Sequence, residues 1–270
     1  MLDSTLIAEL LVLGACTGFL AGLLGIGGGM VLVPFITYIL TSRGVDASLA
    51  VKMAIATSMA TIIFTSLSSV RAHHKRGTVL WPLVVRLAPG IVLGSAVASL
   101  GAFGILKGQG LALVFAGFVG FSAFKMLRNT KPSPSRELPG PAGQLGAGGI
   151  IGFLSGLVGA GGAFISVPYM TWCNVPMHNA VSTAAALGFP IAVANVTGYI
   201  ISGMSAQHLP PGAFGYIYVP ALAVIASASV MIAPLGVRAA HALPVAKLKR
   251  IFAFLLFSLA AYMLNKALTS

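Results

Sequence analysis

Two glycine-rich stretches contain the residues with the clearest potential for chemistry. GFLAGLLGIGGGMVLVPF spans residues 18–35, and GFLSGLVGAGGAFISVPY spans residues 152–169. Ten of their residues recur at a spacing of 134 positions, and half of these ten are glycines. Because glycine disfavours a continuous helix, its repetition within apolar sequence indicates a backbone break that is required twice.

Each break would expose backbone groups that can bind an anion. In GIGGG (Gly25–Gly29) and GAGGA (Gly159–Ala163) we expect one helix to end and another to begin. A helix begins with unpaired N–H groups and a partial positive charge, so a helix start in apolar surroundings attracts an anion. Pro34 and Pro168 are expected to shape the short helices that follow. The expected backbone donors are Gly27, Gly28, Gly29, Gly161 and Gly162.

The other repeated glycines have a structural explanation. Small residues four positions apart let two membrane helices pack closely, and we favour this interpretation for Gly18, Gly22, Gly152 and Gly156. A nucleotide site fits poorly, because the GxGxxG pattern needs a glycine where Met30 stands. No GK[ST] sequence follows either stretch.

Five polar side chains are candidates to assist an anion site. Thr57, Ser58 and Thr183 follow the two stretches at equivalent points, where a hydroxyl would donate to an anion held between the breaks. The alternative is that each hydroxyl bonds a carbonyl of its own helix. Asn195 either faces the transport pathway or joins two helices. Arg86 is either the partner of an anion or a side chain that extends to the lipid headgroups.

The remaining ionisable residues do not suggest a catalytic or metal centre. None of the four acidic residues lies at the centre of an apolar segment, and Glu9, the nearest candidate for a proton relay, is expected at the outer interface. The five histidines lie at segment ends or in loops, and Cys16 and Cys173 lack the spacing of metal ligands. The sequence therefore predicts no metal, no cofactor and no enzymatic activity.

The composition predicts an α-helical membrane protein. Of 270 residues, 57% are hydrophobic and 7% are charged, whereas a soluble domain has roughly a quarter of its residues charged. The strict alternation of an outer-membrane barrel is absent. The net charge of +12 does not indicate nucleic acid, because the basic residues cluster in short loops between apolar segments. The N-terminus lacks the basic region of a signal peptide and is expected to remain as the first membrane segment.

The apolar segments form two sets of five around one linker. Residues 128–143 concentrate proline, serine and charge, so we expect a linker between a first repeat (1–127) and a second repeat (144–270). The second segment of each set is too short to cross a hydrocarbon core that needs about 20 residues. The expected segments lie at roughly 5–24, 28–40, 48–70, 79–100 and 109–127, and then at 144–158, 162–173, 179–202, 214–234 and 248–265.

Loop charges predict opposite orientations for the two repeats. Residues 71–77 and the linker carry basic residues, which assigns them to the cytoplasm. The counterpart of 71–77 in the second repeat, 202–212, has no lysine or arginine, whereas 236–250 has four. This pattern predicts two inverted-topology repeats in an all-α polytopic fold, a plan common among secondary transporters. Each repeat then contains five spanning segments, or three spanning segments and a re-entrant hairpin with the glycine break.

The duplicated motifs GLLGIGGGMVLVP and GLVGAGGAFISVP, each followed by an Ala-x-x-Thr stretch, resemble those of the sulfite exporter TauE/SafE family. The resemblance covers essentially the whole chain. It implies a bacterial-type membrane transporter linked to sulfite, sulfonates and related small anions. In the family the motif after each hairpin is approximately Ala-x-Gly-Thr-Ser. Here Ala56 and Ser182 replace the glycine, and Ala184 replaces the serine of the second motif.

These observations predict a multi-pass transporter of the inner (plasma) membrane that moves a small anion by alternating access. The anion preference follows from the two helix starts. The preference for a sulfur oxyanion or organosulfonate, such as sulfite or sulfoacetate, follows from the family resemblance alone. An anion channel is the nearest alternative, and a membrane enzyme or a scaffold would be a different class. The expected partners are the anion and the lipid bilayer, without nucleic acid, and the sequence leaves the oligomeric state open.

Overall fold

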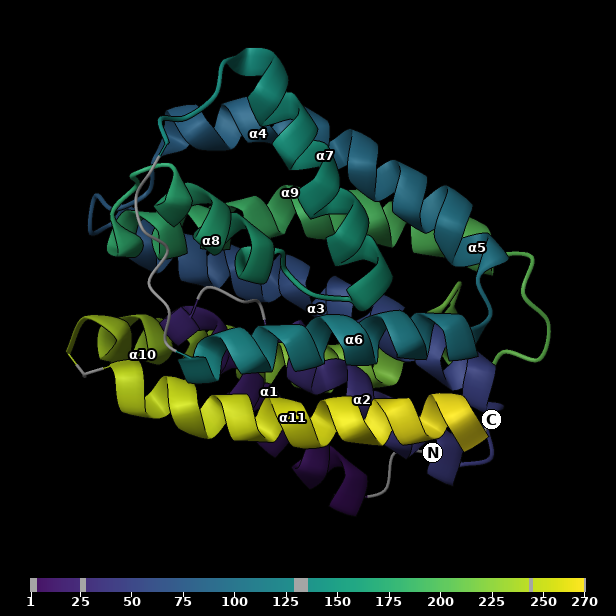
Figure 1. Ribbon diagram of the computed structural model, residues 1–270. Coiled ribbons are helices and arrows are strands. Elements are labelled where there is room, and N and C mark those ends of the chain that lie inside the picture. The colour runs from purple at the N-terminus through teal and green to yellow at the C-terminus, as the bar shows by residue number, and fades with distance from the viewer. Residues whose placement is uncertain (1–3, 25–27, 129–135, 243–244, 270) are drawn as a thin grey trace.

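The computed structural model describes residues 4–24, 28–128, 136–242 and 245–269, and it is almost entirely helical (Figure 1). The first half contains α1 (Ser4–Leu24), α2 (Gly29–Ser42), α3 (Ala47–His74), α4 (Trp81–Ala96), the π-helical turn η1 (Val97–Ala102), α5 (Phe103–Ile105) and α6 (Gly108–Arg128). The second half contains α7 (Pro141–Val158), α8 (Ala163–Trp172), α9 (Met177–Gly203), a hairpin of β1 (Ala213–Phe214) and β2 (Ile217–Tyr218), α10 (Val219–Ala242) and α11 (Val245–Thr269).

Eight helices in the described ranges are long and apolar enough to cross a membrane. The other two apolar helices are shorter: α2 has 14 residues and α8 has 10. At 1.5 Å per residue these helices reach about 21 Å and 15 Å, less than a hydrocarbon core of about 30 Å. The predicted all-α polytopic class is therefore confirmed.

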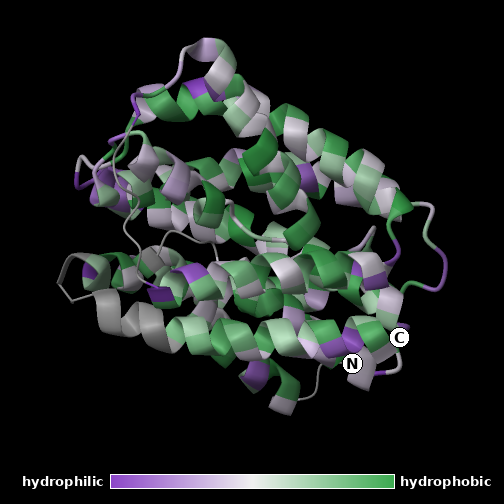
Figure 2. Cartoon of the chain, in the orientation of Figure 1, coloured by the Kyte–Doolittle hydropathy of each residue, from purple (hydrophilic) through white to green (hydrophobic). Residues whose placement is uncertain are grey.

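The surface of the helices is apolar, as a lipid-facing surface must be. Hydrophobic residues cover most of the helical length, whereas many hydrophilic residues gather at the two ends of the helices and in the loops (Figure 2). Large apolar side chains such as Leu93, Phe121 and Phe254 are exposed on the outside of the bundle. In water such a surface would aggregate, so these side chains face lipid.

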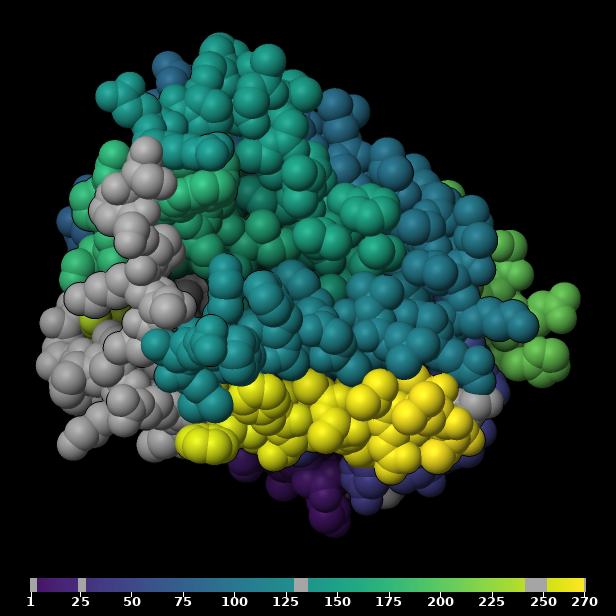
Figure 3. Space-filling view, viewed as in Figure 1, coloured from purple at the N-terminus to yellow at the C-terminus, as the bar shows by residue number. Residues whose placement is uncertain are grey.

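Helices α3 and α9 form the centre of the bundle. Among the eight candidate spans they are the most enclosed, with 67% and 61% of their apolar windows buried. They contact each other, and α3 also contacts α2 and α10, while α9 contacts α8 and α4. On one face of the molecule α11 packs along α6 (Figure 3). The two short helices therefore pack against the central pair.

Close helix packing through glycine joins the two halves. Helix α1 packs against α10, and α7 packs against α4. A Cβ atom at Gly22 would overlap the carbonyl oxygen of Ala233, and one at Gly152 would overlap that of Ile91. Gly18 is similarly close to the backbone of Ser229. The prediction that these glycines allow close packing is confirmed.

The connections separate into two ends of the bundle. The α3–α4 connection and the end of α10 lie at the left in Figure 1, and the long α9–α10 connection lies at the right. The left end carries basic residues, including Arg71 in the last turn of α3 and Lys75 and Arg76 directly after it. By the positive-inside rule we expect this end to face the cytoplasm. We call it the basic end, and the opposite end the outer end.

We expect Gly22→Ala to lower the thermal stability of the detergent-solubilised protein. The added methyl group meets a backbone carbonyl that cannot move without separating α1 from α10, and such overpacking costs about 1–3 kcal/mol. The control is Gly117→Ala on the exposed face of α6, where no atom lies within 4 Å of the new Cβ. This control should unfold at the same temperature as the parent or slightly higher. Equal melting temperatures for the two variants would contradict the packing account.

Candidate functional site

The two glycine-rich stretches adopt the same backbone conformation where the short helices begin. Gly28 precedes α2 with φ 74° and ψ −8°, and Gly162 precedes α8 with φ 76° and ψ −10°. This left-handed region is readily accessible only to glycine. Helix α7 ends at Gly159, which also has a positive φ of 71°. The expected sequence of helix end, break and helix start is thus confirmed for the second stretch; in the first stretch Gly27 lies outside the described residues.

The two breaks touch each other inside the protein. A Cβ atom on Gly29 would overlap the carbonyl oxygen of Gly159 and would lie 3.1 Å from Cα of Ala160. Only a residue without a side chain permits this approach, which explains a glycine at position 29. The start of α2 and the end of α7 are consequently held together at one point.

Ser58 of α3 joins the two breaks. Its side chain is fully buried, and its Oγ lies 3.0 Å from Gly159 O and 3.4 Å from Gly29 O. The hydroxyl therefore donates to a carbonyl oxygen at the point of contact between the breaks. In this structure Ser58 acts on protein backbone, and its predicted contact with an anion stays a prediction.

Thr57 and Thr183 occupy equivalent positions with equivalent partners. The N–H of Tyr218 donates to Thr57 Oγ1 at 2.9 Å, and the N–H of Leu80 donates to Thr183 Oγ1 at 3.1 Å. Tyr218 directly precedes α10 and Leu80 directly precedes α4. Each threonine therefore holds the start of a helix that belongs to the other half of the chain. Neither of the two roles considered from the sequence anticipated this contact.

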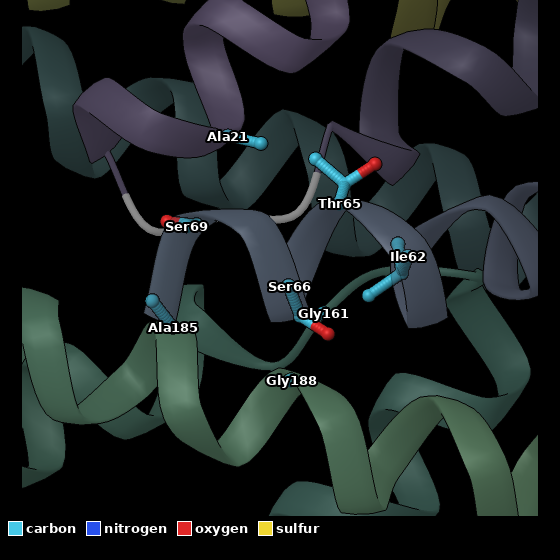
Figure 4. A pocket seen from close by; sticks show the side chains of 8 residues that line it. All are labelled: Ala21, Ile62, Thr65, Ser66, Ser69, Gly161, Ala185 and Gly188. Carbon is cyan, nitrogen blue, oxygen red and sulfur yellow. The ribbon is translucent and has the colours of Figure 1, made fainter. Parts of the chain in front are cut away.

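A small cavity with room for about one water molecule lies beside the second break (Figure 4). Its walls come from α3 and α9, together with the last turn of α1 and the chain between α7 and α8. Ligand pockets for drug-sized molecules have roughly 300–1,000 Å³, so a solute larger than water enters this cavity only if the cavity widens. The lining residues are Ala21, Ile62, Thr65, Ser66, Ser69, Gly161, Ala185 and Gly188.

The cavity is uncharged and its surface is mostly apolar, with three hydroxyl residues in its lining. Ser69 is 1% exposed, and its Oγ has no hydrogen-bond partner among the described residues. Thr65 and Ser66 each donate to a carbonyl of their own helix, at 3.0 and 3.1 Å. The lining includes no acidic or basic residue. A bound solute would therefore meet hydroxyl groups and backbone in a medium of low dielectric constant.

The start of α8 adjoins this cavity through Gly161. The N–H groups of Ile165 and Ser166 donate to Gly162 O at 3.0 and 2.9 Å. Earlier N–H groups of α8 have no acceptor within the helix, because the preceding turn is absent. They carry the positive end of the helix dipole, so this side of the cavity favours negative charge.

The structure does not bring Arg86 or Asn195 to the cavity. Arg86 lies on the exposed face of α4 and is not among the lining residues. Asn195 is fully buried; its Nδ2 donates to Ile191 O at 2.8 Å, and its Oδ1 abuts Gly156 of α7. In this structure the side chain joins α9 to α7, and its predicted place on the transport pathway stays a prediction.

Sequence reasoning missed three hydroxyl residues of the cavity, Thr65, Ser66 and Ser69. The signal was the run TSLSS at residues 65–69, an unusual density of hydroxyls inside a membrane segment. Their spacing places all three on the face of α3 that also carries Ile62.

His73 is more buried than its place at a segment end suggested. It is 1% exposed, and its Nδ1 lies 3.0 Å from Oγ of Ser182 in α9. The same Ser182 Oγ lies 2.8 Å from Thr78 Oγ1. We call these three residues the polar layer. It lies one helical turn beyond Ser69, between the cavity and the basic end.

A multi-pass helical bundle with two helix breaks inside it and a small buried cavity is the architecture of a membrane transporter. The chain belongs to the sulfite exporter TauE/SafE family, whose model matches residues 10–263. It is a multi-pass membrane transporter and not an enzyme.

Relatives from three organisms support the same class. A probable membrane transporter protein of Haemophilus influenzae is 36% identical over 264 residues, which cover 97% of this chain and 99% of the relative. YunE of Bacillus subtilis, also a probable membrane transporter protein, is 28% identical over 76% of this chain and 84% of its own. One from Methanocaldococcus jannaschii is 25% identical over 86% of each chain. No solved structure matches the chain.

We expect Gly28→Ala and Gly162→Ala to destabilise the protein more than Gly44→Ala. All three glycines have a positive φ, which costs a non-glycine residue about 1–2 kcal/mol. At Gly28 a Cβ would also lie 2.9 Å from Thr17, and at Gly162 2.5 Å from Ile191, whereas nothing lies within 4 Å at Gly44. Thermal unfolding in detergent measures the difference. Similar losses at all three positions would show that the breaks are not tightly packed.

Proposed function

We propose that the protein is a secondary carrier that moves a small anion by alternating access, and that the anion is a sulfur oxyanion or an organosulfonate. The observation that carries this proposal is the start of α8 beside a small, uncharged, hydroxyl-lined cavity. Backbone from the two breaks, at Gly28, Gly29, Gly161 and Gly162, would supply the positive potential. Gly27 is also proposed as a backbone donor, because of its place in the first glycine-rich stretch.

The local electrostatics favour an anion over a cation. The cavity lining contains no carboxylate that would attract a cation. The partial positive charge at a helix start attracts an anion most strongly where water is excluded, because the dielectric constant there is low. Hydroxyl donors such as Ser69 complement an oxyanion without adding a full charge, so the anion can leave again. In this account Arg86, exposed on α4, does not contact the substrate.

Alternating access is supported by the correspondence of the two halves. The contact of α1 with α10 has its counterpart in that of α7 with α4. The hydrogen bond of Thr57 to the chain before α10 has its counterpart in that of Thr183 to the chain before α4. Helices α3 and α9 run antiparallel, because the end of α3 meets the start of α9 at His73 and Ser182. We infer two inverted repeats, residues 1–127 and 144–270, and inverted repeats rock about a shared site.

The sulfur preference rests on the family. The matching family is described as a sulfite exporter family, whereas the relatives are described only as probable membrane transporters.

The test is transport by the purified protein in liposomes. Uptake of labelled sulfite, thiosulfate, sulfate, taurine, sulfoacetate, acetate and chloride is compared, with empty liposomes as the control. A carrier is expected to exchange internal for external anion in the absence of a net gradient, and to saturate. A current that grows linearly with voltage would indicate a channel. Transport of cations or neutral solutes alone would contradict the anion proposal.

We expect Ser58→Ala to lower the uptake rate and the melting temperature together. The substitution removes the hydrogen bond that joins the breaks, worth about 0.5–1.5 kcal/mol. The matched control is Ser122→Ala in α6, whose buried hydroxyl donates only to Phe118 O of its own helix. Uptake by Ser58→Ala that equals that of Ser122→Ala would show that contact between the breaks does not limit transport.

A further inference from the structure

We propose that Ser155 and Asn195 form a second polar half-site for the transported oxyanion, on the outer side of the breaks. This half-site would open to the outer end when the cavity at Ser69 closes. The inference rests on the proposed carrier function and adds to it a second set of substrate contacts.

The correspondence of the two halves identifies the residues. The glycine motifs repeat at a spacing of 134, so Ala21 of α1 corresponds to Ser155 of α7. Thr57 and Thr183 have equivalent contacts at a spacing of 126, so Ser69 of α3 corresponds to Asn195 of α9. Ala21 and Ser69 both line the cavity. Their counterparts therefore line its symmetry-related image.

The image is closed in this structure. At the same spacing Thr65 and Ser66 correspond to Ile191 and Ala192. All four residues are buried, with exposed fractions of 1% and 4% for Thr65 and Ser66 and 0% for Ile191 and Ala192. The image therefore has apolar residues where the cavity has two hydroxyl groups, and the carrier proposal requires the image to open in another state.

The closed image contains two polar atoms that lack partners. Ser155 is 2% exposed and Asn195 is 0% exposed, yet neither Ser155 Oγ nor Asn195 Oδ1 has a hydrogen-bond partner within the described ranges. Buried polar atoms are almost always paired, because an unpaired one is costly. A state in which water or a ligand satisfies them would explain why polar residues occur here.

Both residues adjoin the last turn of α7, next to the second break. A Cβ atom on Gly162 would lie 3.0 Å from Ser155 Oγ. Asn195 Oδ1 abuts Gly156, one residue after Ser155. Ser155 can donate its hydroxyl proton, and the Asn195 amide presents its NH₂ group when it rotates. These are neutral donors beside a helix start, the same chemistry as in the cavity, so the ligand class is a small oxyanion.

The closures at the two ends differ in kind. The polar layer of His73, Ser182 and Thr78 separates the cavity from the basic end. Toward the outer end Tyr199, the counterpart of His73, packs against Phe103 with its ring tilted by 43° and the ring centroids 4.4 Å apart. Its hydroxyl donates to Gly156 O. An aromatic closure that contacts α7 beside Ser155 would have to move for the outer half-site to open.

Cysteine accessibility tests the proposal. Single Ser69→Cys, Ser155→Cys and Asn195→Cys variants are made in a chain with Cys16→Ala and Cys173→Ala. A membrane-impermeant maleimide is then added to right-side-out or inside-out vesicles. Ser155→Cys and Asn195→Cys should react from the outer side, and Ser69→Cys from the cytoplasmic side. Ser122→Cys, buried in α6, is the unreactive control. Ala192→Cys reports on the same image if either polar variant fails to fold.

A second substitution should raise the labelling rate at one site and lower it at the other. Tyr199→Phe removes the bond to Gly156 O, and the loss of one such bond shifts a two-state equilibrium by about 2- to 10-fold. We expect labelling of Asn195→Cys from outside to rise by this factor and labelling of Ser69→Cys from inside to fall.

The experiment distinguishes failure of the second half-site from failure of the proposed anion transport. If the cysteine-free parent takes up anions but the image residues react no faster from outside than Ser122→Cys, the second half-site is refuted. If labelling alternates as expected but the parent moves no anion in the panel, the proposed anion transport is refuted instead.

Discussion

The contact between the two helix breaks is the interaction on which the rest of the structure depends. Gly29 approaches Gly159 so closely that no side chain fits between them, and Ser58 donates a hydrogen bond at the same point. Two helix termini are thereby fixed inside the protein, where their unpaired backbone groups would otherwise be costly. The left-handed glycines at positions 28 and 162 let α2 and α8 begin there in matching conformations.

The contact between the breaks explains the arrangement of the helices around it. Irregular backbone at membrane depth is tolerated only inside protein, so the breaks need neighbours that exclude lipid. The central pair, α3 and α9, supplies them, and it also supplies the walls of the cavity. The pairs α1–α10 and α4–α7 connect one half to the other through glycine, while Thr57 and Thr183 hold helix starts across the same boundary. Because these contacts cross from one half to the other, a movement of one half acts directly on the contact between the two breaks.

The sequence predicted the helices and breaks well, because hydrophobic length and glycine clusters are local signals. The expected segment 28–40, for example, is observed as Gly29–Ser42. The sequence predicted the candidate site less well, because side-chain contacts depend on which face of a helix meets which neighbouring helix. Thr57 was chosen correctly as a special position, but its partner Tyr218 is 161 residues away. Arg86 stood out as a charge in an apolar segment, yet its face of α4 is exposed. Ser69 gave only a weak compositional signal.

The most direct test of the account is to locate a bound anion. Selenite and selenate are close analogues of sulfite and sulfate, and selenium is detected in crystals by its anomalous scattering. The account predicts a selenium peak beside Gly161 and the start of α8, within hydrogen-bond reach of Ser69. A peak on the exposed face of α4 near Arg86, or no peak in protein that transports selenite, would contradict a site built by the helix breaks.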